Sequence, residues 1–186
     1  MTLVMFLEEP SMKNFLEGLL PRLAPDVRAI LIPHAGKQDL ERSLVKKLKA
    51  WRDPTARFFV LRDQDAADCK VVKAQLAELC ARAGKPETVV RIVCRALESW
   101  YLADLEAVDK AYGTRLAKQQ QTKKLRDPDR LHSPDRELET LVPRFSKGAG
   151  GRALGPLVDL DNERSPSFFH FVSAVRAAVR EESGDA

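Results

Sequence analysis

Phe58-Phe59-Val60-Leu61-Arg62-Asp63-Gln64-Asp65 joins a continuous apolar run to two carboxylates. Continuous apolar runs are typical of β-strands that are covered on both faces, as in parallel sheets. Three similar runs occupy residues 3–7, 27–32 and 89–93, and each of the last two contains one arginine. We therefore expect four buried central strands, with residues 58–61 as the third.

Stretches with helical periodicity separate these runs. Apolar residues recur there every three or four positions, so each stretch presents one apolar stripe: Phe15, Leu19 and Leu23; Leu40, Leu44, Leu48 and Trp51; Cys69, Val72, Leu76, Leu79 and Ala83. Ser11 is a candidate N-cap of the first helix, and Gly84 is a candidate residue at the end of the third. Strands that alternate with helices predict an α/β fold with a mostly parallel sheet.

The second half of the chain has a weaker pattern. We expect a fourth helix at residues 96–111, a polar, basic surface segment at 113–136 and a short helix at 134–142 that begins after Ser133. Residues 146–151 contain Lys147 and three glycines, do not match the phosphate-binding loop pattern, and are predicted to form a flexible connector. The last helix is expected at 166–180, with frayed residues after it.

The length of 186 residues is typical of one domain. We divide it into a βα core at 1–111, a basic polar excursion with a glycine-rich loop at 112–151, and a helical C-terminal extension at 152–186. No apolar run reaches the roughly 18–20 residues that cross a membrane, and the first ten residues lack the basic start of a signal peptide. A cytoplasmic location is therefore expected.

The cysteine and histidine residues indicate no site. Three cysteines without a Cys-x-x-Cys pair argue against a disulfide framework or a zinc ribbon. The three histidines have no nucleophile beside them in sequence, so none is assigned a role.

Basic residues are concentrated between positions 110 and 130. Seven lysines and arginines occur there against two aspartates, whereas the whole chain has a net charge of +4. Such a segment either follows the phosphates of a nucleic acid or is a solvated loop, and both interpretations stay open. The residues proposed to bind nucleic acid are Lys118, Lys123, Lys124 and Arg126.

Acidic residues follow three of the predicted strands. Glu8 and Glu9 follow the first strand, Asp63 and Asp65 the third, and Glu98 the fourth. Because ligands of open α/β sheets bind at the carboxyl ends of the strands, we expect these groups to converge. Converging carboxylates need a cation or a proton, and hard oxygen ligands suit Mg²⁺ or Mn²⁺.

The Asp-x-Asp pair permits two interpretations. An extended middle residue would place Asp63 and Asp65 on the same side of the chain, where both reach one ion. The alternative is that Asp65 caps the helix that begins near Ala66.

Four segments resemble a known family. Phe6-Leu7-Glu8-Glu9-Pro10-Ser11 resembles the strand-Glu-Gly-x-Ser/Thr opening of a TOPRIM domain, the fold of topoisomerases, DnaG-type primases and OLD nucleases, and residues 59–65 resemble its strand and Asp-x-Asp motif. Ala96-Leu97-Glu98-Ser99-Trp100-Tyr101-Leu102-Ala103-Asp104 and Ser165-Pro166-Ser167-Phe168 resemble two blocks of a TOPRIM-like family known as domain of unknown function 4276. The resemblance covers residues 3–172.

The resemblance implies a TOPRIM-like Rossmannoid three-layer fold with a four-stranded parallel sheet. It places Glu8, Asp63 and Asp65 at the metal-binding and acid/base positions, and Glu98 at the acid of the tryptophan-containing block. The catalytic residues would be these four, with Mg²⁺ or Mn²⁺ as cofactor. Some family members are encoded near restriction or phage-defence genes, which implies DNA or RNA as substrate and a partner protein such as an ATPase.

Two functions from different classes follow. The first is metal-dependent phosphodiester hydrolysis or phosphotransfer on nucleic acid, with Asp63 and Asp65 on the ion and Glu8 as general acid or base. The second is a non-catalytic TOPRIM-like accessory protein that binds a partner. The second is favoured by Glu9, which stands where TOPRIM domains usually have a glycine.

Overall fold

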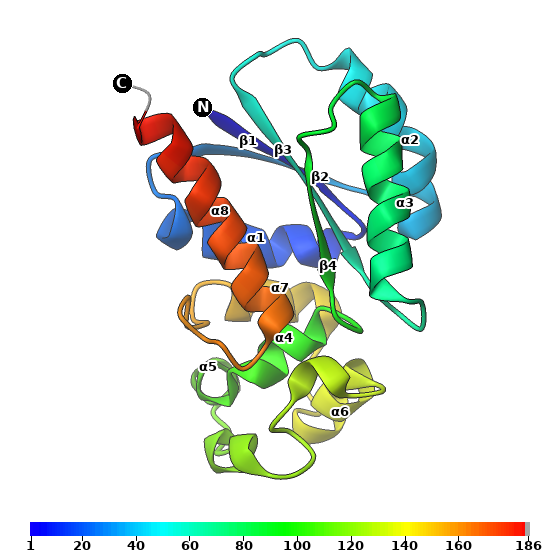
Figure 1. The fold of residues 1–186 in the computed structure, drawn as a ribbon. Helices are drawn as coiled ribbons and strands as arrows, with labels where there is room; N and C mark the ends of the chain where they lie inside the picture. The colour runs from blue at the N-terminus through cyan, green and yellow to red at the C-terminus, as the bar shows by residue number, and fades with distance from the viewer. Residues whose placement is uncertain (185–186) are drawn as a thin grey trace.

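The computed structural model describes residues 1–184 and contains a four-stranded sheet. The strands are β1 (Thr2–Leu7), β2 (Arg28–Pro33), β3 (Ala56–Asp63) and β4 (Val89–Val93). Their order is β2-β1-β3-β4, and every neighbouring pair is parallel (Figure 1). The predicted parallel α/β fold is therefore confirmed.

Helices cover both faces of this sheet, because alternate side chains of each strand point to opposite faces. Val4 and Phe6 share one apolar cluster with α2 (Lys37–Ala50) and α3 (Cys69–Arg82). Leu3, Met5 and Leu7 share the other cluster with α1 (Pro10–Leu23) and with most of the chain beyond β4. The result is three layers, α/β/α.

Only β1 and β3 are central strands. The prediction of four buried central strands is wrong for β2 and β4, which form the two edges, and Arg28 and Ala29 of β2 are exposed. The chain leaves β1 toward β2 and returns past β1 to β3, so the strand order reverses at β1. Ligands of open α/β sheets bind at such a reversal, beyond the carboxyl ends of the strands. Leu7 pairs with Leu61 there, which brings Glu8 beside the end of β3.

The helix predicted at 96–111 is two helices, α4 (Glu98–Ala103) and α5 (Leu105–Tyr112). Asp104 lies between them with a non-helical backbone, and its carboxylate accepts hydrogen bonds from the N–H groups of Ala107 and Asp159. It therefore caps α5 and binds a distant loop.

The prediction of a glycine-rich loop at 146–151 is wrong, because this segment forms α7 (Lys147–Leu154). Its glycines permit close packing on α1. A Cβ atom at Gly151 would lie 2.7 Å from the Ser11 carbonyl oxygen, and one at Gly155 would lie 2.2 Å from that of Phe15. The glycines therefore permit backbone contact between two helices.

The N-cap of α1 is Glu9, followed by Pro10, so the prediction that Ser11 is the cap is wrong. The Ser11 hydroxyl donates a hydrogen bond to the Glu9 carboxylate instead. Gly84 follows α3 with φ +75°, a conformation that favours glycine, as predicted.

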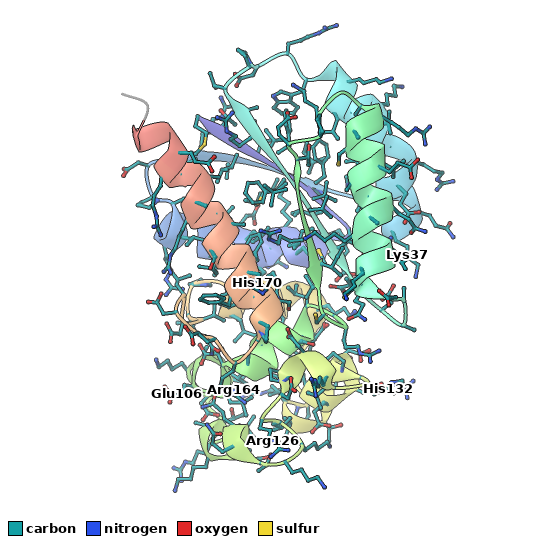
Figure 2. The ribbon with its side chains drawn as sticks, in the orientation of Figure 1. Lys37, Glu106, Arg126, His132, Arg164 and His170 are labelled. Atoms are coloured by element: carbon teal, nitrogen blue, oxygen red, sulfur yellow. The ribbon has the colours of Figure 1, made fainter. Side chains whose placement is uncertain are left out.

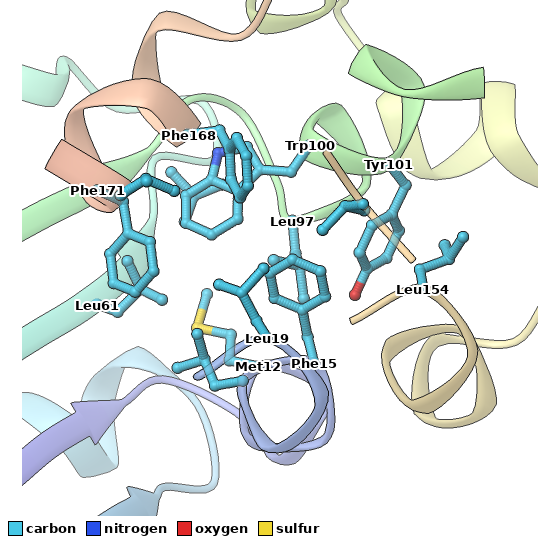
Figure 3. Close-up of a cluster of buried hydrophobic side chains, with 14 of the residues drawn as sticks. Met12, Phe15, Leu19, Leu61, Leu97, Trp100, Tyr101, Leu154, Phe168 and Phe171 are labelled. Carbon is cyan, nitrogen blue, oxygen red and sulfur yellow. The ribbon is translucent and has the colours of Figure 1, made fainter. Parts of the chain in front are cut away.

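The last helix, α8 (Pro166–Gly184), extends past the predicted end at residue 180; residues 185–186 lie outside the described chain. Trp100 lies in the core between Phe15, Phe168 and Phe171 (Figure 3). Its indole N–H donates to Ser167 Oγ at 2.8 Å. The tryptophan and Ser-Pro-Ser-Phe blocks therefore bind one another inside the core.

The basic segment is folded rather than extended. It contains two 3-10 helices, η1 (Ala117–Gln121) and η2 (Pro128–Arg130), and is followed by α6 (Pro134–Leu141). The Arg164 guanidinium donates to the carbonyl oxygens of Gln120 and Leu125, both at 2.7 Å, and holds the segment against the C-terminal extension (Figure 2). Among the described residues, no helix has the length and apolar character to cross a membrane.

Candidate functional site

A pocket of about 160 Å³ lies beyond the carboxyl end of β3, near the point where the strand order reverses. Its wall combines acidic and basic side chains from β3, the turn after β4, the end of the basic segment and α7: Asp63, Asp65, Arg95, His132, Asp135 and Lys147.

Asp63 is the last residue of β3 and is 6% exposed. Its backbone N–H donates to Glu8 Oε2 at 3.0 Å, whereas its own Oδ1 is buried and has no hydrogen-bond partner among the described residues. Burial raises the pKa of the Asp63 carboxyl well above its usual value, and the negative charges of Glu8, Glu98 and Glu9 raise it further. An ionised Asp63 in this place calls for a cation.

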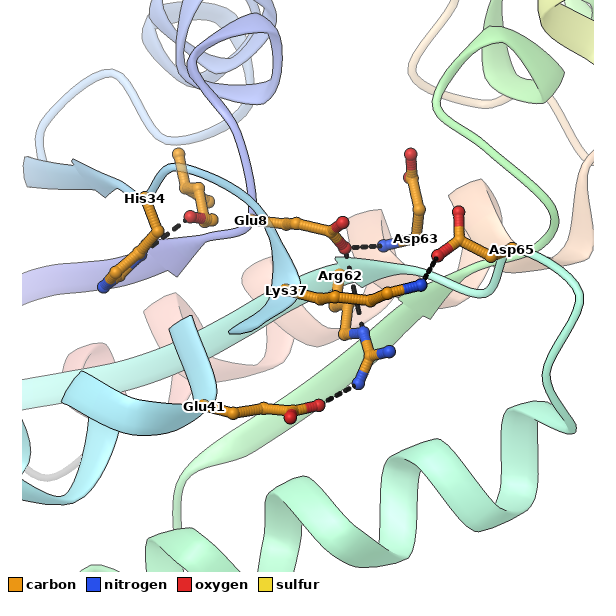
Figure 4. A network of polar contacts seen from close by, with 8 residues as sticks. Glu8, His34, Lys37, Glu41, Arg62, Asp63 and Asp65 are labelled. Carbon is orange, nitrogen blue, oxygen red and sulfur yellow. Dashed lines mark hydrogen bonds and ion pairs between the residues drawn. The ribbon is translucent and has the colours of Figure 1, made fainter. Parts of the chain in front are cut away.

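Glu8 follows β1 and faces the end of β3 (Figure 4). Its Oε2 lies 3.8 Å from Nε of Arg62, a buried arginine that also pairs with Glu41 at 2.5 Å. Burial raises the pKa of Glu8 even though the Asp63 N–H and the Arg62 charge act in the opposite direction. Glu8 is thus fixed in place and has an arginine as neighbour.

Asp65 lines the same pocket as Asp63 and has a protein cation as its partner. Its φ of 56° is left-handed, and its carboxylate accepts a hydrogen bond from Lys37 Nζ at 2.8 Å (Figure 4). Its backbone N–H donates to the Arg95 carbonyl oxygen, which attaches the turn to the end of β4. The two aspartates of the Asp-x-Asp motif therefore line one pocket, where Asp65 is paired with Lys37.

The prediction that Asp65 caps α3 is also wrong. Asp68 is the N-cap, and its Oδ1 accepts from the N–H groups of Lys70 and Val71 at 2.7 and 3.3 Å. Helix α3 starts at Cys69, three residues later than the pattern indicated.

Glu98 is the first residue of α4 and is 2% exposed. Its Oε2 has no hydrogen-bond partner in the part of the chain that the structure describes, and Lys147 Nζ lies 3.9 Å from its Oε1. Burial raises the pKa of Glu98, and the Lys147 charge lowers it by less. The fully buried Tyr101 hydroxyl also has no partner, and its pKa is raised by burial and then by Glu98 and Asp63. Glu98 therefore belongs to the same buried acidic region as Asp63.

Lys147 reaches this region from the start of α7. Burial alone would lower the pKa of Lys147, but the charges of Glu98, Glu9 and Asp63 raise it overall. Sequence analysis missed this residue because glycines followed it. The spacing of Gly151 and Gly155, four residues apart, is typical of one face of a helix. It could have indicated that Lys147 begins a helix and not a loop.

Arg95, His132 and Asp135 were missed as well. Arg95 has a left-handed φ of 64° in the turn after β4, and Asp135 lies in the first turn of α6, close enough to influence the pKa of Glu98. Both reach the pocket through tertiary contacts, and no local sequence pattern indicates them. His34 is buried, faces away from Glu8 and hydrogen-bonds the Leu7 carbonyl oxygen (Figure 4).

The basic residues proposed for nucleic acid are exposed, but none of them lines the pocket: Lys118, Lys123, Lys124 and Arg126. Lys124 pairs with Glu137 at 2.5 Å, so part of its charge is neutralised within the protein. These residues stay a predicted binding surface, separate from the pocket itself.

The donor atoms of the site suit a hard divalent cation. Asp63 Oδ1 and Glu98 Oε2 are buried carboxylate oxygens without partners, and Mg²⁺ and Mn²⁺ prefer such oxygens. Within residues 1–184, however, no three histidine, cysteine or acidic side chains are gathered as a ready metal cluster. Glu8 and Asp65 face protein cations instead.

Comparisons with known proteins agree with this fold. The chain is similar to the C-terminal region of the Burkholderia pseudomallei OLD protein, with a TM-score of 0.52 and 17% identity over 95% of this chain and 98% of that one. At that identity the likeness shows the fold, which is TOPRIM-like. No curated protein matches the chain. The family model for the domain of unknown function DUF4276 matches residues 7–176, and the chain therefore belongs to the DUF4276 family.

Proposed function

We propose that this protein is a Mg²⁺- or Mn²⁺-dependent nuclease that hydrolyses phosphodiester bonds at the pocket beyond β1 and β3. The observation that supports the proposal is the pair of buried carboxylates, Asp63 and Glu98, each with an oxygen that has no hydrogen-bond partner within residues 1–184. An unpaired buried polar atom costs about 1–3 kcal/mol, so a structural role alone does not explain two of them in one region.

Asp63 and Glu98 would hold the cation. When bound, a divalent ion polarises a phosphoryl oxygen and stabilises the charge that develops in the transition state. Glu8 lies beside Asp63, and its raised pKa brings it closer to the neutral range in which a general acid or base is effective. Lys147 and Arg95 add positive charge to a pocket that would otherwise repel a phosphate.

The similarity to the OLD protein region supports a nuclease over other activities of α/β folds. The exposed lysines at 118, 123 and 124 provide a surface for DNA or RNA outside the pocket. A partner protein such as an ATPase would add substrate selection or energy coupling.

A cleavage assay tests the proposal. The purified protein is incubated with plasmid DNA and with single-stranded RNA in Mn²⁺, in Mg²⁺ and in EDTA, in parallel with Asp63→Asn and Glu98→Gln. We expect metal-dependent cleavage that falls at least about a hundredfold in each variant, as losses of transition-state stabilisation typically do. Asp26→Asn is the matched control, because Asp26 is exposed in the loop before β2.

A second candidate function is a non-catalytic accessory role. The observation that favours it is that Glu8 and Asp65 are already matched with Arg62 and Lys37. Equal cleavage by the wild type and by Asp63→Asn, or no cleavage with either metal, would favour this role over the nuclease.

A further inference from the structure

The position of Lys37 is fixed by the backbone around it. Lys37 is the first residue of α2 and follows Gly36, whose φ of +98° favours glycine. The Gly36 N–H donates to the Glu8 carbonyl oxygen at 2.9 Å, which attaches the start of α2 to the end of β1. The lysine side chain then extends past Glu8 to Asp65 (Figure 4).

The acidic residues at the sheet edge thus fall into two groups. Asp65 has the Lys37 ammonium at 2.8 Å, and Glu8 has the Arg62 guanidinium at 3.8 Å. The second group, Asp63 and Glu98, has buried oxygens without hydrogen-bond partners within residues 1–184, and Lys147 lies 3.9 Å from Glu98. Both groups have a protein cation within 4 Å, but among the described residues only the second group keeps buried carboxylate oxygens without a hydrogen-bond partner.

We propose that Lys37 is the resident cation of Asp65, so that the site takes one divalent ion, at Asp63 and Glu98, and not a second ion at Asp65. The inference rests on the proposed function, because it concerns the same acidic residues. It assigns Asp65 a role different from that of Asp63: Asp65 holds the Lys37 ammonium, whereas Asp63 binds the divalent ion.

The positive charge of Lys37 disfavours a second divalent ion at Asp65. A second divalent ion at Asp65 would be repelled by the first ion and by the Lys37 and Arg62 charges. The Lys37–Asp65 pair is about half exposed, with side-chain exposures of 49% and 43%, so its attraction is screened by water. Removal of the lysine charge should therefore strengthen Mn²⁺ binding at Asp65 by about two- to fivefold, and the titration extends to millimolar Mn²⁺ so that a second ion is detected.

The test is a Mn²⁺ titration of EDTA-stripped protein, with bound ions counted by calorimetry and by the loss of the free-Mn²⁺ EPR signal. The variants are Lys37→Met, Asp65→Asn and the double variant, with Lys37→Arg as the conservative replacement. Lys46→Met is the matched control, because Lys46 is an exposed lysine on the same helix.

We expect one Mn²⁺ per chain for the wild type, Asp65→Asn, Lys37→Arg and Lys46→Met. Lys37→Met should bind a second ion, and the double variant should return to one. Two ions on the wild type, with one lost in Asp65→Asn, would overturn the inference and leave the proposed function intact. One ion on both the wild type and Lys37→Met would also overturn it, whereas no ion on the wild type would overturn both.

Discussion

Replacement of Asp63 by asparagine removes a buried negative charge while the shape of the side chain is kept. The ionised carboxylate is 6% exposed, has an oxygen without a partner and lies near Glu8, Glu98 and Glu9. We therefore expect Asp63→Asn to stabilise the metal-free protein, although it damages the proposed site.

The expected gain in stability is the difference between two costs. A buried, unneutralised carboxylate costs several kcal/mol, and the asparagine amide retains a cost of about 1–3 kcal/mol for its own unpaired atoms. The difference leaves a gain of roughly 2 kcal/mol at pH 8. For a chain of this length each kcal/mol changes Tm by about 2–4 °C, so Tm should rise by about 4–8 °C.

The gain should depend on pH in one direction. Because the pKa of Asp63 is raised in the folded protein, the stability of the wild type is greatest when the group is protonated and decreases as the pH rises through the folded-state pKa. The difference between Asp63→Asn and the wild type should therefore be small near pH 4 and largest at pH 8. Glu8 and Glu98 have raised pKa values too and change stability in the same direction in both proteins.

Thermal unfolding in EDTA at pH 4 and pH 8 measures this effect, with Asp26→Asn as the exposed control. Addition of Mn²⁺ should raise Tm of the wild type at pH 8 and leave Asp63→Asn unchanged, because a bound ligand stabilises only the state that binds it. A Tm for Asp63→Asn that is lower than that of the wild type at pH 8 would refute the reasoning.

Three further predictions concern the packing of α7, the anchoring of the basic segment and its binding of nucleic acid. Gly151→Ala should lower stability by about 2 kcal/mol in urea unfolding, since its Cβ would lie 2.7 Å from a carbonyl oxygen of α1, whereas Gly148→Ala, with no atom closer than 3.9 Å, should leave stability unchanged or slightly higher. Arg164→Met should speed tryptic cleavage within 113–131, because the carbonyl groups of Gln120 and Leu125 lose their donor; unchanged digestion would count against this anchor. A triple variant replaces Lys118, Lys123 and Lys124 by glutamine. In a fluorescence-anisotropy titration this variant should bind DNA or RNA more weakly and with less dependence on salt. Equal binding by the variant and the wild type would exclude this surface.

The sheet and its flanking helices were predictable because apolar periodicity reports burial directly. Residues 89–93 form β4 as expected, and the leucines at 40, 44 and 48 all lie in the core. Strand order was not predictable in this way. Strand β2 has an apolar sequence and yet lies at an edge of the sheet, where its residues are exposed or only half-buried. Burial on one face and burial on both produce similar patterns in short runs.

Tertiary contacts explain the larger errors. Helix α7 forms although glycine has a low helix propensity, because α1 packs directly on its glycines. The break between α4 and α5 at Asp104 is not marked by a proline or glycine. It depends on a hydrogen bond from the N–H group of Asp159, 55 residues away.

The acidic residues were predictable in kind and less so in arrangement. The sequence pattern predicted that Glu8, Asp63, Asp65 and Glu98 converge, but it did not predict that Lys37 pairs with Asp65 or that Arg62 lies beside Glu8. The left-handed backbone at Asp65 and the lysine that follows Gly36 depend on contacts between distant segments. Asp135 and Lys147 approach the pocket for the same reason.

The central claim is that Asp63 and Glu98 hold a divalent cation beyond the carboxyl ends of β1 and β3. The most direct measurement is an anomalous difference map from a crystal of the protein grown with Mn²⁺. We predict one peak per chain, in contact with carboxylate oxygens of Asp63 and Glu98, while Lys37 stays on Asp65. A peak between Glu8 and Asp65 with Lys37 displaced, or no peak near these acids, would contradict the account.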